Sequence, residues 1–505
     1  MSKFLKILCF ILIFFCFHLG AFGQIIVKND FQLNNDVTTT SQTDPSIAID
    51  SVGNFVVVWT DIRNGNYDIY GQMCDDTGKF VGANFKVNNI DGTNLQQSTP
   101  DVARNPAGSF VVVWQDDRNG NYDIYAQRYN AAGTLQGDNL VVENGSASQI
   151  SPSVAMDSLG NFVVVWQDSV NGNWDIFGLR FNSSGTPQGT KFKVNESAGT
   201  DSSQITPTVG MDKNGNFVVA WYDCRNSSQM KGDIYSQRFN SSGGAIGNNF
   251  LVSGDLGSQV QIEPTISVSG SGDFIIAWAD WRNSQSDIYA QRYNSTGETE
   301  GINFRVNSAT GYISWRYPSV ALTPSDEFVI TWTHNNDIIA QEYNSSGVAV
   351  DGNFLVNNYS TASQNRSDVS STGAYTYFVW QDYRNGVTNP DIYAKVVTWG
   401  WSEVPEDRED GVSGEFALGQ NYPNPFNPQT SISFHLKQSG KVSIRVYNIL
   451  GQRVRDLVDG YYQNGEHKAD WDGKDDNGKD VSTGIYFYQI KTENSIQAKK
   501  MVLLR

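Results

Sequence analysis

The hydrophobic positions of this chain repeat with a period of about 55 residues. Each repeat contains a continuous apolar run that ends in tryptophan. These runs lie at 55–59, 110–114, 162–166, 217–221, 274–278 and 328–332, with a less regular seventh copy at 375–380. Short apolar runs of this kind predict β-strands that are buried on both faces.

Three further strand patterns accompany each apolar run. The first follows a proline, as at 152–157, and leads through a glycine-containing turn into the run. A polar turn such as 119–121 (Asn-Gly-Asn) then precedes a third strand at 123–129, because Asn-Gly between β-rich segments is a strong hairpin signal. A fourth segment, such as 192–195, alternates like a half-exposed outer strand. Four strands per repeat are typical of the blades of a β-propeller.

The two ends of the repeat array decide between architectures. The seventh copy stops after its third strand at 391–395, and an unpaired strand pattern at 30–34 precedes the first copy, which begins at Pro45. An N-terminal strand that completes the last blade would close the ring and leave no open edge. We therefore predict an all-β fold, with a seven-bladed β-propeller over 24–398. A stacked array of β-sandwiches is the alternative.

The N-terminus has the pattern of a signal peptide. Lys3 and Lys6 precede an apolar run at 7–19, and the small residues of 21–23 offer a cleavage site before Gln24. The run is short for a membrane anchor, which needs about 20 apolar residues. We therefore predict a signal peptide at 1–23 and no transmembrane span in the mature chain.

An acidic, aperiodic segment at 399–417 predicts a linker, and the pattern then changes. Alternating runs separated by Asn-Gly and Asp-Gly turns predict a small Ig-like β-sandwich at 418–505. Asp residues at 470–480 lack the spacing of a calcium loop, so solvated turns are the preferred interpretation.

The order of motifs in this tail resembles a known family. From about residue 416 it is similar to the type A C-terminal sorting domain of type IX secretion substrates. The residues that carry this resemblance are Asn421, Pro423, Pro425, Phe426, Asn427, Pro428, Tyr447, Gly451, Gly484, Lys499 and Lys500. The resemblance implies export across both membranes of a Gram-negative bacterium, with the type IX machinery as partner. It also implies removal of the tail, followed by attachment to surface lipopolysaccharide or release.

Composition narrows the functions that remain. Lys and Arg number 36 against 53 Asp and Glu, and a net charge of −17 argues against nucleic acid as a partner. Only Cys74 and Cys224 remain outside the signal peptide, and His334 is the single histidine of the predicted propeller. The predicted propeller therefore has too few histidines and cysteines to favour a Ser-His-Asp hydrolase or a zinc site. We expect no cofactor and no metal.

A Trp-x-Asp-x-Arg-Asn motif follows the second strand of most repeats. Its Asp and Arg residues are Asp61 with Arg63, Asp116 with Arg118, Asp223 with Arg225, Asp280 with Arg282, and Asp382 with Arg384. Because an active site is usually needed once, repetition around a ring favours a structural role, with the arginine held by this Asp or by the Asp that opens the third strand. A ring of carboxylates that holds a cation is the alternative.

Positions that break the repeat are candidates for ligand binding. The first strands begin with Gln-x-x-Pro in five copies, but with 315–318 (Trp-Arg-Tyr-Pro) and 365–368 (Asn-Arg-Ser-Asp) in the last two. Exposed Trp, Tyr and Arg are good binding anchors. We predict a ligand patch on one propeller face; its residues are Trp281, Arg282, Trp315, Arg316, Tyr317 and Arg366. Drift of degenerate repeats is the competing explanation.

These observations favour an exported surface or secreted protein whose propeller is a non-catalytic binding or adhesion module, for polysaccharide or for an extracellular protein. The alternative is a secreted carbohydrate-active enzyme, a sialidase-like glycosidase or a lyase, that uses carboxylates on one face. The turn at 157–162 resembles the sialidase Asp-box only faintly, and the arginines belong to the repeats. A scaffold for a co-exported partner is a third interpretation.

Overall fold

The computed structural model describes residues 24–36, 40–89, 95–170, 172–196, 202–225, 231–254, 259–283, 285–308, 315–386, 388–399, 416–419, 421, 426–436, 438–448, 453–476, 478–492 and 496–504. The predicted signal peptide and most of the predicted linker lie outside these residues. Every regular element within them is a β-strand. The chain divides into two compact units, Met1–Glu403 and Val404–Arg505.

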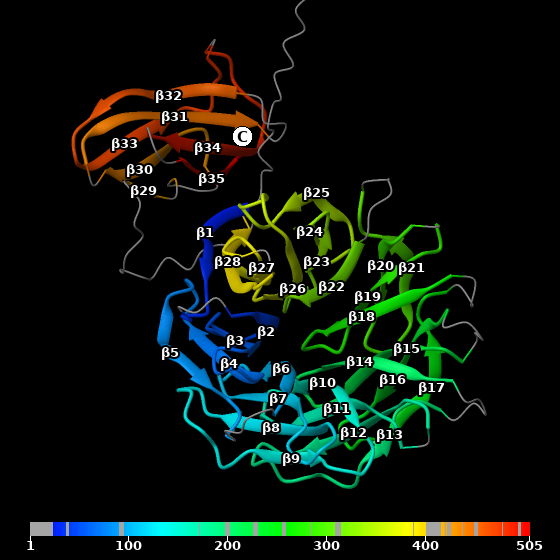
Figure 1. The fold of residues 1–505 in the computed structure, drawn as a ribbon. Coiled ribbons are helices and arrows are strands. Elements are labelled where there is room, and N and C mark those ends of the chain that lie inside the picture. The colour runs from blue at the N-terminus through cyan, green and yellow to red at the C-terminus, as the bar shows by residue number, and fades with distance from the viewer. Residues whose placement is uncertain are drawn as a thin grey trace, which may run out of the picture. The chain divides into compact units, whose positions relative to one another are not determined.

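The first unit contains seven antiparallel four-stranded sheets, which are the blades of a propeller (Figure 1). The strands of blades 1 to 3 are β2 (Gln42–Ile49), β3 (Phe55–Asp61), β4 (Asp68–Cys74), β5 (Phe80–Lys86), β6 (Gln97–Arg104), β7 (Phe110–Asp116), β8 (Asp123–Tyr129), β9 (Leu140–Glu143), β10 (Gln149–Met156), β11 (Phe162–Asp168), β12 (Asp175–Phe181) and β13 (Phe192–Lys193).

Blades 4 to 6 repeat this order. Their strands are β14 (Gln204–Met211), β15 (Phe217–Asp223), β16 (Asp233–Phe239), β17 (Ala245–Leu251), β18 (Gln261–Val268), β19 (Phe274–Asp280), β20 (Asp287–Tyr293), β21 (Thr299–Arg305), β22 (Trp315–Leu322), β23 (Phe328–His334), β24 (Asp337–Tyr343) and β25 (Ala349–Leu355). The first strands of all blades are innermost, and each contacts the first strand of the next blade around a closed ring.

Blade 7 joins the two ends of the array. It consists of β26 (Gln364–Ser371), β27 (Tyr375–Asp382), β28 (Asp391–Trp399) and the N-terminal strand β1 (Gln24–Gln32), which pairs antiparallel with β28. The backbone N–H of Leu33 continues this pairing and donates to the carbonyl of Ile392 at 2.8 Å. The predicted closure by an N-terminal strand is confirmed, and the strand begins earlier than its apolar pattern indicated.

The apolar runs that defined the repeat fill the space between blades. The tryptophan that ends each run is fully buried, as for Trp59 and Trp380. Because each second strand has a blade on both sides, alternate side chains enter two different inter-blade clusters, as Val57 and Val58 do. This arrangement explains why these strands are apolar at every position rather than at every second one.

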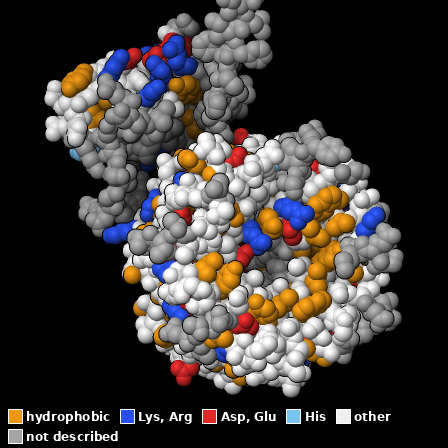
Figure 2. Space-filling view, in the orientation of Figure 1, with side chains coloured by type: hydrophobic (Ala, Val, Ile, Leu, Met, Phe, Trp, Pro, Cys, Tyr) orange, Lys and Arg blue, Asp and Glu red, His pale blue; other side chains and the backbone are white. Residues whose placement is uncertain are grey.

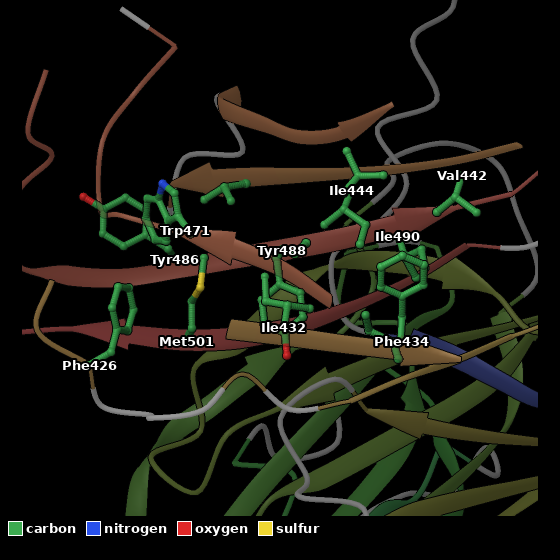
Figure 3. Packing of buried hydrophobic residues seen from close by; sticks show 14 of the residues in the cluster. Phe426, Ile432, Phe434, Val442, Ile444, Trp471, Tyr486, Tyr488, Ile490 and Met501 are labelled. Atoms are coloured by element: carbon green, nitrogen blue, oxygen red, sulfur yellow. The ribbon is translucent and has the colours of Figure 1, made fainter. Parts of the chain in front are cut away.

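The second unit is a β-sandwich of two sheets. A three-stranded sheet contains β29 (Phe416–Leu418), β30 (Thr430–Leu436) and β33 (Gly465–Trp471). The four-stranded sheet contains β32 (Arg453–Tyr462), β31 (Gly440–Asn448), β34 (Gly484–Lys491) and β35 (Ile496–Leu503). Figure 3 shows the core between them, where Trp471 lies against Phe426 and Tyr486 with ring centroids at 5.5 and 5.1 Å. The predicted Ig-like sandwich is confirmed.

The motif residues of this sandwich are partly core and partly surface. Asn421 and Phe426 are buried, and Asn421 Nδ2 donates to Thr430 Oγ1 at 2.9 Å. Asn427 and Pro428 are exposed, while Pro423, Pro425 and Gly451 lie outside the described residues. Tyr447 and Gly484 lie on paired strands, and so do Lys499 and Lys500. Within the acidic turn, Asp475 accepts the backbone N–H of Lys479 at 2.9 Å.

No helix among the described residues is long and apolar enough to cross a membrane.

Candidate functional site at the channel mouth

The first strands of all blades begin at one face of the propeller, where the second strands end and the third strands begin. We call this face the mouth face. It carries the Trp-x-Asp-x-Arg motifs and the repeat departures that the sequence singled out. The space-filling view shows a hollow in the middle of the propeller, with basic and acidic side chains close together on one part of its rim and hydrophobic side chains around much of the rest (Figure 2).

The repeated arginines are held by the aspartate that ends the second strand. The five pairs, which we call the arginine braces, are Arg63–Asp61 at 2.6 Å, Arg118–Asp116 at 2.5 Å, Arg225–Asp223 at 2.7 Å, Arg282–Asp280 at 2.6 Å and Arg384–Asp382 at 2.6 Å. Each arginine also lies over the tyrosine ring of its own third strand. The Arg118 guanidinium, for example, is 3.9 Å from the centroid of the Tyr125 ring. All five aspartates are fully buried.

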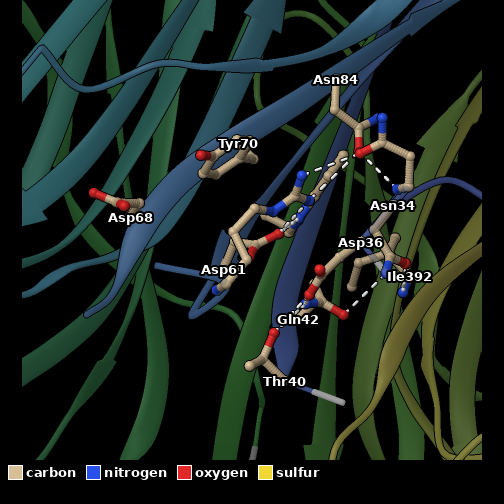
Figure 4. A network of polar contacts seen from close by, with 12 residues as sticks. Asn34, Asp36, Thr40, Gln42, Asp61, Asp68, Tyr70, Asn84 and Ile392 are labelled. Carbon is tan, nitrogen blue, oxygen red and sulfur yellow. Dashed lines mark hydrogen bonds and ion pairs between the residues drawn. The ribbon is translucent and has the colours of Figure 1, made fainter. Parts of the chain in front are cut away.

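The braces belong to a hydrogen-bond network that links neighbouring blades. Between blades 1 and 2, Asn88 Nδ2 donates to Asp68 at 2.9 Å and to Gln97 at 3.3 Å. Gln97 in turn donates to Asp116 at 3.2 Å, and the Trp114 indole donates to the same carboxylate at 3.0 Å. Figure 4 shows the equivalent network where the N-terminal segment meets blade 1. A buried network with its members paired stabilises the ring.

This network accounts for one residue of the predicted ligand patch. Arg282 donates to Asp280 through Nε at 3.0 Å and to the carbonyl of Ser253 at 2.9 Å, and it lies over Tyr289 at 4.1 Å. Its side chain is 20% exposed. Arg282 is therefore one of the five braces, and its partners lie within its own blade and the blade before.

A second repeated feature is a bulge near the start of each innermost strand. One residue per blade has φ between 50° and 56°, which forms a ring of seven; its members are Asp44, Thr99, Ser151, Thr206, Glu263, Tyr317 and Arg366. The register of each first strand shifts at this point, as between Thr43 and Ser46. Left-handed backbone at residues other than glycine is strained and is often found at functional sites. We call these residues the bulge ring.

The bulge ring is uneven in chemistry. Blades 2 to 4 carry Thr or Ser, whereas blades 5, 6, 7 and 1 carry Glu263, Tyr317, Arg366 and Asp44. In blades 3, 4 and 1 the bulge N–H is capped by a glutamine from the second strand of the preceding blade, as by Gln167 Oε1 at 2.8 Å for Thr206. Blade 5 has Ala279 at that glutamine position, and Glu263 Oε2 accepts the N–H of Tyr317 at 2.8 Å instead.

The charged and aromatic members of this region contact one another across four blades. We call them the mouth cluster; its members are Asp44, Glu263, Trp281, Arg316, Tyr317 and Arg366. Arg316 Nη1 lies 3.5 Å from Glu263 Oε1, and Arg366 Nη1 lies 2.6 Å from Asp44 Oδ1. Each guanidinium also lies over an aromatic ring of the preceding blade. Arg316 is 5.5 Å from the Trp281 ring centroid, and Arg366 is 4.8 Å from that of Tyr317.

Exposure separates these arginines from the braces. The side chains of Arg316 and Arg366 are 42% and 48% exposed, whereas the five brace arginines are between 10% and 20% exposed. The structure thus brings four of the six predicted patch residues together. Arg282 belongs to a brace. Trp315 is the first residue of β22, and its side chain lies outside the described part of the chain.

Glu263 interacts with both arginines of the mouth cluster. Burial raises the pKa of Glu263 above its usual range, and the Tyr317 N–H and the charges of Arg316 and Arg366 oppose this rise. Sequence comparison of the repeats missed both Glu263 and Asp44, because the Gln-x-x-Pro pattern looks regular there. The signal was present in the residue before each proline, which varies from Thr to Glu to Tyr.

Two further carboxylates lie deeper, one on each of two innermost strands. Asp101 accepts Ser46 Oγ at 2.8 Å and the Val154 N–H at 2.9 Å, so it links three consecutive blades. Asp368 accepts Ser319 Oγ at 2.6 Å and the Ile47 N–H at 2.9 Å in the same way. Burial raises the pKa of Asp101, and it raises the pKa of Asp368 to about 6, with a smaller contribution from the charge of Asp101.

Among the described residues, no group of three or more His, Cys, Asp and Glu side chains is placed to hold a metal ion. Cys74 and Cys224 are buried and unbonded to each other.

Comparison with known proteins identifies the tail. Residues 420–504 match the family model of the secretion system C-terminal sorting domain. The chain therefore carries a type IX C-terminal sorting domain attached to a seven-bladed propeller. This domain indicates export, with a cell-surface or secreted location, and it implies interaction with the type IX secretion machinery.

The propeller has distant likenesses among solved structures. They include a protein of unknown function from Dyadobacter fermentans (9% identity, TM-score 0.44, covering 62% of this chain and 97% of that one). An ulvan lyase of polysaccharide lyase family PL25 has 12% identity and a TM-score of 0.48, over 74% and 96% of the two chains. An α-L-arabinofuranosidase from Fusarium graminearum has 10% identity and a TM-score of 0.43, over 74% and 98%. Scores this low carry no argument about function, and no curated protein matches the chain.

Proposed function

We propose that the propeller is a non-catalytic binding module for an extracellular polysaccharide, displayed at the cell surface or released. The observation that carries this proposal is the mouth cluster. It lies where the repeats differ most, and it exposes two arginines that are not held in buried braces. Exposed arginines beside aromatic rings are frequent anchors of binding sites. We further propose domain limits of 1–23, 24–398, 399–417 and 418–505 for signal, propeller, linker and sorting domain.

An enzymatic function has one specific observation in its favour, which is the raised pKa of three carboxyl groups near the axis. Both Asp101 and Asp368 accept a serine hydroxyl and backbone N–H groups, which supports a structural role for them. Glu263 accepts the Tyr317 N–H with one oxygen and faces Arg316 with the other. None of these three carboxyl groups therefore has both oxygens available to a substrate, which favours binding without turnover.

The test is a glycan and polysaccharide array probed with the purified full-length protein, with binding and product release measured together. We expect binding without released sugar, and weaker binding by Arg316→Gln. A matched control is Lys79→Gln, in the exposed turn between β4 and β5 away from the mouth face. Released oligosaccharide would establish the carbohydrate-active enzyme instead. Absence of binding to every glycan would overturn the proposal.

A further inference from the structure

The two exposed arginines change what the aromatic rings of the mouth cluster can do. Sugars commonly stack on exposed Trp and Tyr faces, and Trp281 and Tyr317 both belong to the predicted ligand patch. In the structure, Arg316 lies over the Trp281 ring and Arg366 lies over the Tyr317 ring. The rings therefore serve as platforms for guanidinium groups, and what the cluster offers to a ligand on that side is planar, charged donors.

Each of these arginines has donors beyond those used within the protein. A guanidinium has five N–H donors in a fixed plane. Arg366 pairs with Asp44 through Nη1, and Arg316 faces Glu263 through Nη1. With 42% and 48% of the two side chains exposed, much of each guanidinium remains open to solvent. Carboxylate and sulfate groups are the ligands whose geometry a guanidinium matches with two parallel hydrogen bonds.

The two arginines lie on neighbouring blades, which extends this chemistry to a chain-like ligand. Arg316 lies on β22 of blade 6 and Arg366 on β26 of blade 7, and these innermost strands contact each other. The Glu263 carboxyl group interacts with the charges of both arginines. The two guanidiniums are thus a pair on adjacent blades that offers donors to the acidic groups of one ligand.

We propose that the mouth cluster binds an acidic saccharide, and that Arg316 and Arg366 receive its carboxylate or sulfate groups. This proposal rests on the proposed function and names the class of its ligand. The net charge of −17 repels anions at long range, but at about 0.15 M ionic strength charges are screened beyond roughly 8 Å. The affinity for an acidic ligand therefore depends on its direct contacts with the cluster. The ligand is therefore held by local pairing rather than by the overall field of the protein.

Titration calorimetry of the full-length protein with matched ligand pairs tests this assignment. One pair is an oligogalacturonide and its neutral methyl ester; the other is a sulfated galactan oligosaccharide and its desulfated form. We expect the acidic member of at least one pair to bind about tenfold or more tightly than its neutral partner, since a charge-assisted hydrogen bond is worth about 1.5–3 kcal/mol. The ligand pair whose acidic member binds more tightly identifies carboxylate or sulfate as the recognised group.

Variants that are expected to change the affinity in opposite directions distinguish a loss of binding from a loss of folding. Arg316→Gln and Arg366→Gln should each weaken binding of the acidic ligand about tenfold, with partial recovery in Arg366→Lys. Asp44→Asn removes the carboxylate that competes for Arg366, so it should strengthen binding several-fold. A variant that merely damages the fold would not gain affinity.

Three outcomes would overturn the inference. Equal binding of acidic and neutral members, unchanged in the arginine variants, would refute the ligand class and leave the binding function standing. Binding of polyglutamate but of no saccharide would assign the cluster to an acidic peptide. Absence of binding to every saccharide, while the protein remains folded, would remove the proposed function itself.

Discussion

Arg366 Nη1 donates to Asp44 Oδ1 at 2.6 Å, although the two residues are 322 positions apart in the chain. The pair joins blade 7 to blade 1 at the mouth of the propeller. Arg384 makes a second connection within the same blade, to Asp382 at 2.6 Å and to Asp30 of the N-terminal strand at 2.9 Å. The first pair is half-exposed and the second is largely buried, and this difference in burial predicts different contributions to stability.

We expect Arg366→Gln to lower the free energy of unfolding by less than about 1 kcal/mol, because exposed ion pairs contribute little. Arg384→Gln should lower it by about 3 kcal/mol or more, since it leaves two buried carboxylates without their cation. Urea denaturation of the two variants and the wild type measures both values. Equal losses would show that burial does not distinguish the two arginines.

The closure of the ring depends on Asn34. Its Nδ2 donates to Asp391 at 2.7 Å and to Gln42 at 3.0 Å, and its Oδ1 accepts the N–H of Ile392 at 2.9 Å. Asn34→Ala should cost roughly 1–3 kcal/mol, because it leaves a buried N–H group unpaired. The neighbouring Asn35 is exposed, so Asn35→Ala should change stability by no more than about 0.5 kcal/mol. Thermal unfolding of both variants provides the comparison, and a large effect of Asn35→Ala would contradict it.

Blade 3 contains a compensated departure from the repeat. The arginine of its brace is replaced by Val170. An asparagine that lies in the outer strand or directly before it in blades 1, 2 and 4 to 6 is replaced by Lys191. Lys191 Nζ lies 3.5 Å from the buried Asp168 and 3.2 Å from Glu143, and it lies over the Phe177 ring. The lysine thus supplies the positive charge that the missing arginine would have given.

This substitution pair predicts a measurable coupling. Lys191→Asn alone should destabilise the protein by about 1–3 kcal/mol, because Asp168 then lacks a cation. Adding Val170→Arg should restore most of that loss, since it rebuilds the brace of the other blades. A double-mutant cycle by urea denaturation isolates the interaction. Additive effects would mean that Lys191 does not replace the arginine.

Much of the fold could be predicted because the strand pattern of one blade occurs seven times in the sequence. Each apolar run marks a buried second strand, and counting strands at both ends of the array predicted that an N-terminal strand completes blade 7. The bounds of that strand could not be predicted. Its first half, from Gln24 to Lys28, pairs with the end of β28, and its sequence has too little periodicity to reveal this.

The candidate site was predictable only in part. The departures at Arg316, Tyr317 and Arg366 were visible as breaks in a repeat, but their partners come from other blades. The contact between Arg316 and Trp281 joins a strand of blade 6 to a turn of blade 5, and a single sequence does not encode such distances. Arg282 was included in the patch although its motif occurs five times, and the brace geometry gives the physical reason for that repetition.

Asp368 makes stability depend on pH. Its pKa is raised to about 6 in the folded protein, compared with about 3.9 for an ordinary Asp. Between these values the folded state retains a proton that the unfolded state has lost, so the free energy of unfolding falls as pH rises, by at most about 1.4 kcal/mol per pH unit. This decrease in the free energy of unfolding begins at about pH 4 and is complete above about pH 6.

Asp368→Ser tests this dependence with the residue found at the same position in blades 1, 3 and 6. The variant should gain stability relative to wild type by up to about 3 kcal/mol as the pH rises from 4 to 7, whatever its difference at pH 4. Urea denaturation at half-unit pH intervals measures the two curves, with the exposed Asp138→Asn as control. Parallel curves for Asp368→Ser and wild type would mean that this carboxyl group is not protonated in the folded protein near pH 5, and that the serine and amide donors around it offset its burial.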